Sequence, residues 1–224
     1  RIDRDGEDYI MLPSAKDYKR YGDGDTGMNT AGLGAISPSA VDNEEFEQKV
    51  VNRILLPTLR GLKEEGLDYR GFLYLGLTDC GGEPVIFEYN VRLGDPEAQV
   101  ILPRIESDLI DLLEGIADRT LALKRLTVNP AVSTGIVLAA KGYPGIPVRG
   151  DVVSGIESAE ESGCRVYKGA VSLNEEGDTV TDGGRIATVV AMASCETEAA
   201  EKAYRGVEMI HFDGKYYRHD IGRS

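Results

Sequence analysis

Residues 85–97 read Val-Ile-Phe-Glu-Tyr-Asn-Val-Arg-Leu-Gly-Asp-Pro-Glu, with apolar and polar side chains in alternation over most of the stretch. Successive side chains of a β-strand point to opposite faces, so Glu88, Asn90 and Arg92 are expected to project together. The rise of a strand puts the first two roughly 6 to 7 Å apart. The pattern predicts a strand that ends in a group of polar side chains.

A carboxylate, an amide and a guanidinium on one face suit a hard divalent cation that carries phosphate. Magnesium usually takes only one or two protein oxygens and leaves its other positions to water and phosphate, while an arginine fork matches a phosphoryl group. The same spacing also fits an edge strand with one polar face. Asp95 and Glu97 follow directly in a turn fixed by Pro96, which favours a binding site over a plain edge.

A second segment, residues 22–34, is rich in glycine, and Lys16, Lys19 and Arg20 bring positive charge up to it. Glycine lets backbone amides approach a ligand closely, so the segment is a candidate phosphate-binding loop. It lacks the strand and helix that flank a dinucleotide fingerprint, and it lacks the Gly-Lys-Ser/Thr of a Walker loop. A mobile surface loop is the alternative interpretation.

Three stretches together resemble one family. Residues 86–99, IFEYNVRLGDPEAQ, resemble the signature of glycinamide ribonucleotide synthetases (phosphoribosylamine–glycine ligases), which are ATP-grasp enzymes of purine synthesis. Residues 17–35, DYKRYGDGDTGMNTAGLGA, resemble the glycine-rich loop of that family. A third similar region runs from Val132 to the end and includes GYPG at 142–145 and DGGR at 182–185. The resemblance covers nearly the whole chain in order.

The resemblance implies an α+β chain. Residues 1–120 would form the C-terminal half of an ATP-grasp domain, an antiparallel sheet with helices that begin near residues 42 and 107. Residues 131–224 would form a small β-rich C-terminal domain. The family's N-terminal domain, adenine pocket and phosphate-binding lysines would lie before Arg1, so the chain is expected to be a fragment that is catalytically silent alone.

The implied reaction joins glycine to 5-phosphoribosylamine by way of glycyl phosphate, with ATP cleaved to ADP and phosphate. By resemblance, Glu88 and Asn90 would hold Mg²⁺ or Mn²⁺, and Arg92 would stabilise charge on the transferring phosphoryl group. The residues near glycine, phosphate and the amine substrate would be Asp23, Asp25, Asn29, Asp95 and Glu97.

One departure concerns the metal. ATP-grasp sites often have a further acidic ligand on the preceding strand, but residues 72–78 contain none. Either Asp79 is the third ligand or there is no third ligand.

Two other functions also stay open. The chain could belong to a different ATP-grasp carboxylate–amine ligase, or to a noncatalytic binding module that retains half of the fold.

Composition sets wider limits. The 224 residues hold 25 basic and 38 acidic side chains, a net charge of -13, which argues against nucleic acid or an anionic membrane as partner. The expected partners are therefore small molecules and the preceding domains of the same polypeptide. Cys80, Cys164 and Cys195 have no metal-like spacing and are expected to be reduced thiols. Together with the lack of a leader or an apolar span, this predicts a cytoplasmic protein.

Periodicity predicts the remaining elements. Gly76 stands where an aliphatic side chain is expected, which indicates a bulge or close packing. Helices are expected from 42 to 66 with a break at Pro57, from 107 onward, and from 196 to 210. Strands are expected at 9–12, 70–78, 83–90, 133–140, 164–173 and 185–194.

Overall fold

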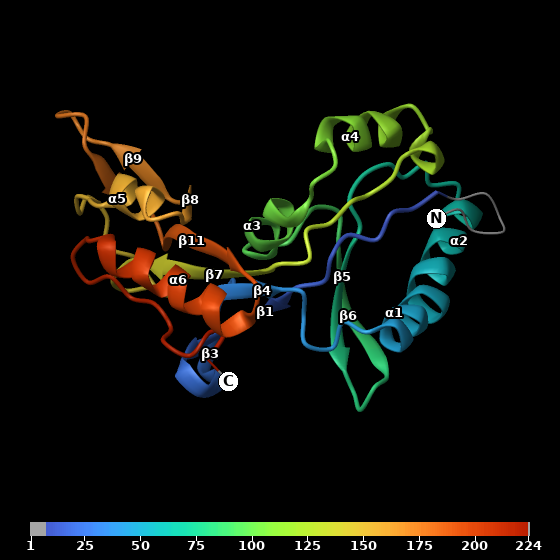
Figure 1. The fold of residues 1–224 in the computed structure, drawn as a ribbon, viewed down its shortest axis with the longest axis horizontal. Helices are drawn as coiled ribbons and strands as arrows, with labels where there is room; N and C mark the ends of the chain where they lie inside the picture. Colours follow the sequence, from blue (N-terminus) through green and yellow to red (C-terminus); the bar gives the residue numbers. More distant parts are fainter. Residues whose placement is uncertain (1–7, 224) are drawn as a thin grey trace. The chain divides into compact units, whose positions relative to one another are not determined.

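The computed structural model describes residues 8–223, and the chain divides into two compact units (Figure 1). The first unit comprises residues up to 14, 39–94 and 105–129, and the second comprises 15–38, 95–104 and 130–224. This interleaved division differs from the linear division at 120 and 131 that the sequence predicted. The reason is backbone pairing, because strands from residues 15–38 join the sheet formed by strands within residues 132–193.

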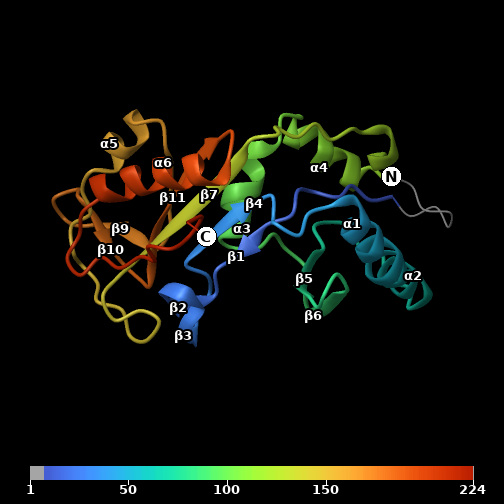
Figure 2. The ribbon, with the colours of Figure 1, turned by 60° about the horizontal axis from the view of Figure 1, so that its bottom comes forward.

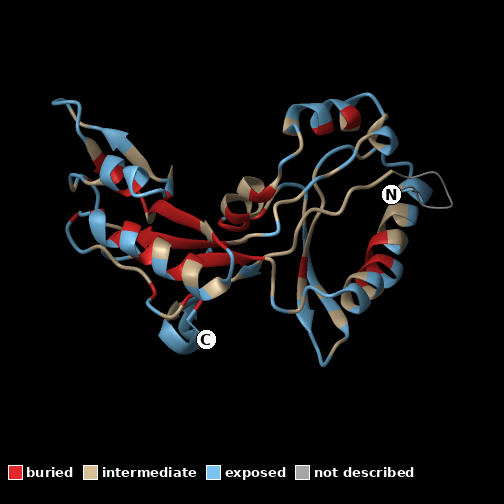
Figure 3. Cartoon of the chain, viewed as in Figure 1, coloured by how far each residue is buried: buried red, intermediate tan, exposed pale blue. Residues whose placement is uncertain are grey.

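The second unit is built on a five-stranded sheet with the order β1-β4-β7-β11-β8. Each neighbouring pair is antiparallel. The strands are β1 (Lys16–Asp17), β4 (Gly34–Ser37), β7 (Val132–Ala139), β11 (Arg185–Ala193) and β8 (Arg165–Lys168). In β7 and β11 almost every residue is buried, as a run of β-branched and small residues predicts (Figure 3).

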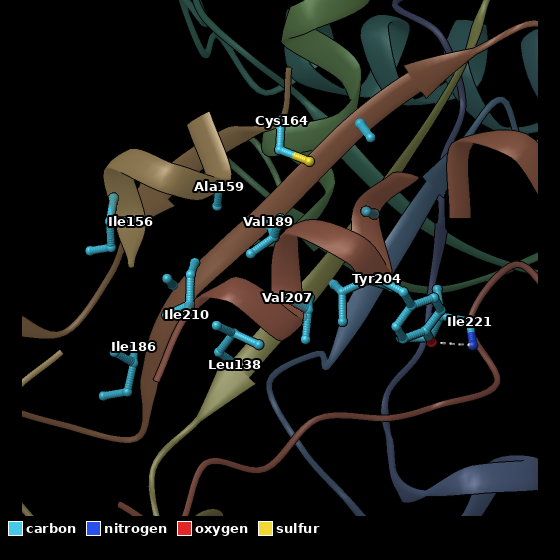
Figure 4. Close-up of a cluster of buried hydrophobic side chains, with 14 of the residues drawn as sticks. Leu138, Ile156, Ala159, Cys164, Ile186, Val189, Tyr204, Val207, Ile210 and Ile221 are labelled. Carbon is cyan, nitrogen blue, oxygen red and sulfur yellow. Dashed lines mark hydrogen bonds between the residues drawn. The ribbon is translucent and has the colours of Figure 1, made fainter. Parts of the chain in front are cut away.

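Helix α6 (Glu196–Met209) covers one face of this sheet, and α5 (Ile156–Glu161) lies against α6 (Figure 2). The side chains of Ala199, Ala203 and Val207 recur every four residues and are fully buried. Ala203 and Val207 belong to the largest hydrophobic cluster, which also contains the side chains labelled in Figure 4. The predicted helix at 196–210 is therefore confirmed and supplies the main core of the unit.

Helix α3 (Glu97–Ile101) packs through Val100 against Ala35 and Val190 of the sheet. Gly135 permits this approach, because a Cβ at that position would lie 2.8 Å from Val100 Cγ1. A short 3-10 turn (Leu102–Arg104) continues α3. The helix thus begins directly after the Asp95-Pro96 turn and is fixed to the sheet within one turn.

The first unit contains a nearly continuous helical segment. Asn43 caps it by accepting a hydrogen bond from the Phe46 amide. The segment consists of α1 (Glu44–Val50), a π-helical turn (Val51–Leu55) and α2 (Leu56–Glu64). The predicted break at Pro57 corresponds to the start of α2.

Two further helical elements complete the described part of this unit: α4 (Leu109–Ala117) and a 3-10 turn (Leu121–Leu123). Asp108 caps α4, which agrees with the helix predicted from residue 107 onward.

The strands of the first unit are fewer than predicted. Within the described residues its named strands are the hairpin β5 (Tyr74–Asp79) and β6 (Pro84–Asn90), and no strand forms at 9–12. In the second unit, the predicted strand 164–173 is divided into β8 and β9 (Val171–Leu173), and β9 pairs with β10 (Thr179–Thr181).

No helix within residues 8–223 is both long and apolar enough to cross a membrane.

Candidate functional site

A β-bulge precedes the predicted metal residues. Leu77 pairs with Ile86 and Gly76 pairs with Glu88, so Phe87 is the extra residue in β6. A Cβ on Gly76 would lie 2.5 Å from Glu88 Cγ and 3.0 Å from the Phe87 ring. Both side chains therefore lie over Gly76, so Phe87 and Glu88 do not point to opposite faces, as neighbouring residues of a regular strand would. The bulge and close packing predicted at Gly76 are both present.

Glu88 and Asn90 both follow the bulge at alternate positions, so they share a face of β6. The residue opposite Glu88 is Gly76, which presents no side chain that could compete for the same space. Arg92 lies beyond the end of β6 and donates from Nη1 to the Leu93 carbonyl at 2.8 Å. The strand thus presents one carboxylate and one amide, and the guanidinium belongs to the following bend.

The donor set at β6 fits a magnesium ion that completes its coordination with phosphate and water. Asp79, the open candidate for a third ligand, accepts a hydrogen bond from the Gly82 amide at 2.6 Å in the β5–β6 turn. In the part of the chain that the structure describes, no group of three His, Cys, Asp or Glu side chains could hold a metal. Protein ligands alone would therefore make a weak site.

The glycine-rich segment folds into a hairpin instead of an open loop. It consists of β2 (Arg20–Gly22), a 3-10 turn (Asp23–Asp25) and β3 (Thr26–Asn29). Asn29 is exposed and pairs in register with Arg20. A hairpin restricts the backbone more than an open loop does, because inter-strand pairs fix part of residues 20–29.

Arg218, whose side chain is fully buried, anchors the tip of this hairpin. It donates to Asp25 Oδ1 at 2.8 Å, to the two Asp220 oxygens at 2.8 and 2.6 Å, and to the Arg20 carbonyl at 3.1 Å. Burial lowers the pKa of Arg218, but hydrogen bonds to Asp220 and Asp25 outweigh burial and raise it overall. The same contact holds the pKa of Asp220 far below its usual value. This buried cation is charged at any accessible pH.

Asp23 is held by the same C-terminal segment. It accepts a hydrogen bond from the His219 amide at 2.8 Å, and its other oxygen lies 3.3 Å from His219 Nδ1. Next to it, Tyr216 stacks on Tyr21 with ring centroids 4.3 Å apart. Two of the residues predicted to contact substrate or phosphate, Asp23 and Asp25, therefore have protein partners that fix the turn.

Arg185, at the start of β11, joins the glycine-rich segment to the Asp95-Pro96 turn. Its Nη2 lies 2.6 Å from Asp95 Oδ2, and its Nη1 donates to the Asp95 carbonyl at 3.0 Å and to the Ala31 carbonyl at 2.9 Å. Asp95 Oδ1 accepts a further hydrogen bond from Gln99. The predicted residue Asp95 is thus oriented from both oxygens.

Glu97 is 4% exposed in the first turn of α3. The Asp17 side chain is 7% exposed and interacts electrostatically with Glu97. Lys19 Nζ lies 3.0 Å from Asp17 Oδ2, while Oδ1 is buried and has no hydrogen-bond partner among residues 8–223. Burial, and next the charge of Glu97, raise the pKa of Asp17 to about 6, against the opposing effects of Lys19 and Arg185.

The structure assigns the predicted site residues to two groups. Glu88, Asn90 and Arg92 belong to the first unit, and the others belong to the second. Sequence reasoning missed the roles of Asp17, Arg185 and Arg218. All three lie in stretches that carried the family resemblance, but only Asp17 and Arg185 lie in motifs quoted for it, DYKRYGDGDTGMNTAGLGA and DGGR. Arg218 lies outside the quoted motifs, so nothing in the sequence singled it out.

Two family models match the chain in order. Residues 3–98 match the phosphoribosylglycinamide synthetase ATP-grasp (A) domain, and residues 133–224 match the C domain of the same enzyme family. Together with the α+β architecture, this places the first match in the ATP-grasp class of domains. The chain belongs to the phosphoribosylglycinamide synthetase family.

Curated and solved relatives agree. The phosphoribosylamine–glycine ligase of Vibrio parahaemolyticus is 43% identical over 97% of this chain and 51% of its own length. The crystal structure of the Thermotoga maritima phosphoribosylamine–glycine ligase is 36% identical over 96% of this chain and 52% of that chain, with a TM-score of 0.85. The chain spans about half the length of these relatives.

A more distant structure shares the fold alone. The biotin carboxylase domain of a thermophilic 2-oxoglutarate carboxylase, solved with bicarbonate, is 16% identical over 92% of this chain and 44% of that chain, with a TM-score of 0.58. The predicted α+β class with an ATP-grasp half and a β-rich C-terminal part is confirmed.

Replacing Arg218 with Ala is expected to lower the free energy of unfolding by about 3 kcal/mol, because a buried cation with several partners is lost. The two carboxylates left behind are partly exposed, which limits the loss. Denaturant titration of the chain measures it. Lys202→Ala, which removes an exposed ion pair with Glu198, is the control and should cost less than about 1 kcal/mol. Equal losses in the two variants would contradict the anchoring role.

Asp17→Asn tests the buried carboxyl. Because the folded-state pKa of Asp17 lies above its unfolded value of 3.8, its contribution to stability is greatest below pH 3.8 and is lost as pH rises through about 6. The stability of the Asn variant relative to the unmodified chain should therefore rise between pH 4 and 7.5, by up to about 3 kcal/mol. Urea titrations at each pH measure the difference. Asp213→Asn, an exposed site, controls for the loss of one negative charge. A pH-independent difference for Asp17→Asn would refute the assignment.

Proposed function

We propose that the chain is the metal-strand and C-domain portion of a phosphoribosylamine–glycine ligase of purine synthesis. The observation that carries the proposal is the pair Glu88 and Asn90 on one face of β6, with Glu88 opposite Gly76, within a chain 43% identical to such ligases. The reaction would join glycine to 5-phosphoribosylamine, with ATP cleaved to ADP and phosphate. The remaining parts of the active centre would come from the region that precedes this match in the relatives.

Glu88 and Asn90 would hold Mg²⁺ or Mn²⁺ together with the phosphates of ATP. The ion would neutralise charge that develops on the phosphoryl group during transfer to the glycine carboxylate. Two protein oxygens are enough for this purpose, since phosphate and water complete the coordination. Arg92, whose fork can contact two phosphoryl oxygens at once, would bind the same group from the adjoining bend.

The second step needs positioning more than it needs an acid or a base. The amine nitrogen attacks the carbonyl carbon of glycyl phosphate, the C–N bond forms, the C–O bond to phosphate breaks, and the nitrogen proton leaves with the phosphate. Asp95 and Glu97 would orient the amine substrate next to the acyl group. Asp23, Asp25 and Asn29 would shape the glycine and phosphate region, the two aspartates by fixing the hairpin tip through the C-terminal segment.

The acidic composition and the small-molecule substrates are consistent with a cytoplasmic enzyme that binds neither nucleic acid nor membrane.

Glu88→Gln tests the metal strand in the full-length protein, meaning this chain together with the region that precedes its match in the relatives. The variant should lose at least 100-fold in kcat, because the neutral amide is a weaker ligand for a hard cation. Folding should be unchanged, because the side chain is exposed. Glu83→Gln, an exposed carboxylate at the other end of the same hairpin, should keep activity within twofold. Turnover of Glu88→Gln near that of the unmodified protein would sink the metal assignment.

A second test uses this chain alone. Without an adenine pocket and further phosphate contacts, its affinity for a magnesium complex of a nonhydrolysable ATP analogue should be millimolar or weaker, since each factor of ten corresponds to about 1.4 kcal/mol of lost contacts. Calorimetric titration measures this affinity. Micromolar binding, or ADP release with glycine and phosphoribosylamine, would show that the chain is a complete catalyst and that it needs no preceding region.

A further inference from the structure

We propose that Arg185 is a positioning residue for the ligation reaction, because it couples the end of the glycine-rich segment to the Asp95-Pro96 turn. The proposal rests on the function proposed above, in which Asp95 and Glu97 lie beside the amine substrate and residues 22–34 lie beside glycine and phosphate. Arg185 comes from the C domain. Its role gives the C domain a part in the chemistry besides folding.

The contacts of Arg185 are directed at two segments simultaneously. In the glycine-rich segment, Nη1 donates to the carbonyls of Ala31 and Gly32 at 2.9 and 3.4 Å. In the turn, Nη1 donates to the Asp95 carbonyl at 3.0 Å and Nη2 donates to the Asp95 carboxylate at 2.6 Å. A planar fork with fixed donors can meet this set of acceptors, and the single ammonium of lysine cannot reproduce its geometry.

The two segments also press directly on each other at Gly32. A Cβ on this residue would lie 2.5 Å from Pro96 Cδ and 2.7 Å from Asp17 Oδ1, and its φ of 103° is one that favours glycine. The neighbouring residue, Ala31, donates from its amide to the Tyr143 hydroxyl at 3.0 Å. Residues 31 and 32 thus contact the turn through Pro96 and the C domain through Arg185 and Tyr143. A displacement of either segment would therefore disturb the other.

Charge gives Arg185 a second effect on the same region. Asp17 faces Lys19 from its own segment, Glu97 from α3 and Arg185 from β11, and Asp95 bonds to Arg185 directly. Three carboxylates therefore face two cations. Loss of Arg185 would leave one cation, and since Arg185 opposes the rise in the pKa of Asp17, that pKa would move further upward.

A purely structural tie and a positioning role make different kinetic predictions. If Arg185 only maintains the fold, its replacement would lower the fraction of active protein, which reduces the apparent kcat and leaves each KM unchanged. A positioning residue next to the amine and glycine region would raise the KM for one of these substrates while the KM for ATP stays the same, because Arg185 belongs to the unit that does not contain the proposed metal strand.

The experiment compares Arg185→Ala, Arg185→Lys and a control in the full-length protein. Both Arg185 variants should lower kcat/KM for glycine or phosphoribosylamine at least tenfold, with the KM for ATP within twofold. Added guanidinium should restore part of the activity of Arg185→Ala, because the Arg185 side chain is 21% exposed and solvent can reach its place. The control is Arg149→Ala, which removes an exposed Arg–Asp pair in the same unit and should change no parameter by more than twofold.

A second readout does not depend on catalysis. In the chain alone, amide hydrogen exchange at residues 31–33 should be at least tenfold faster in Arg185→Ala than in the unmodified chain, while exchange in β7 stays unchanged. Unchanged exchange at 31–33 would overturn the coupling. Equal loss of kcat with every KM unchanged and no rescue by guanidinium would overturn the positioning role. An unmodified full-length protein without ligase activity would instead overturn the proposed function, and hydrogen exchange would still decide whether Arg185 couples the two segments.

Discussion

Backbone pairing between β4 and β7 is the constraint on which the second unit depends. It brings residues 34–37 against residues 133–136, from opposite halves of the chain, into one antiparallel sheet. The hairpin that follows β1 lies at the C domain because only a few residues join it to β1 and β4. The turn that precedes α3 lies there because Val100 of α3 packs against Ala35 and Val190 of the sheet. The contacts of Arg185, and those of Arg218 with Asp25 and the Arg20 carbonyl, are consequences of this topology, since these partners are remote in sequence.

The two arginines anchor the glycine-rich segment at different points and by different physics. Arg218 is completely buried and bonds to carboxylates that remain partly in water, so its contribution is chiefly to stability. Arg185 is partly exposed and bonds mostly to backbone carbonyls, so it defines position more than it adds stability. The glycine-rich segment is therefore anchored at its tip by Arg218 and at its end, where the proposed substrates lie, by Arg185.

The sequence predicted local elements well and long-range partners poorly. The helices at 44–64, 109–117 and 196–209 follow from apolar periodicity and capping residues, which are local signals. The interleaving of residues 15–38 with the C domain was missed because no local pattern specifies which strand a short strand joins. The same limit explains the site. Glu88 and Asn90 lie two apart on one strand and could be predicted together, whereas the Asp25–Arg218 pair connects residues whose proximity only the fold creates.

Asp17 shows why a buried group can point to function. Its carboxyl is withdrawn from water with one oxygen unbonded within the described residues, and the shift of its pKa to about 6 means that the fold is less stable at neutral pH than it would be with a neutral side chain of the same shape. Packing does not require the charge, because an amide would fill the same space. Such a stability cost at a buried carboxyl beside the segment held by Arg185 marks Asp17 as a group to test for a role in the proposed reaction. Arg185 opposes the rise in the pKa of Asp17, as Lys19 does more strongly, so the residue that positions the two segments also favours the ionised form of that carboxyl.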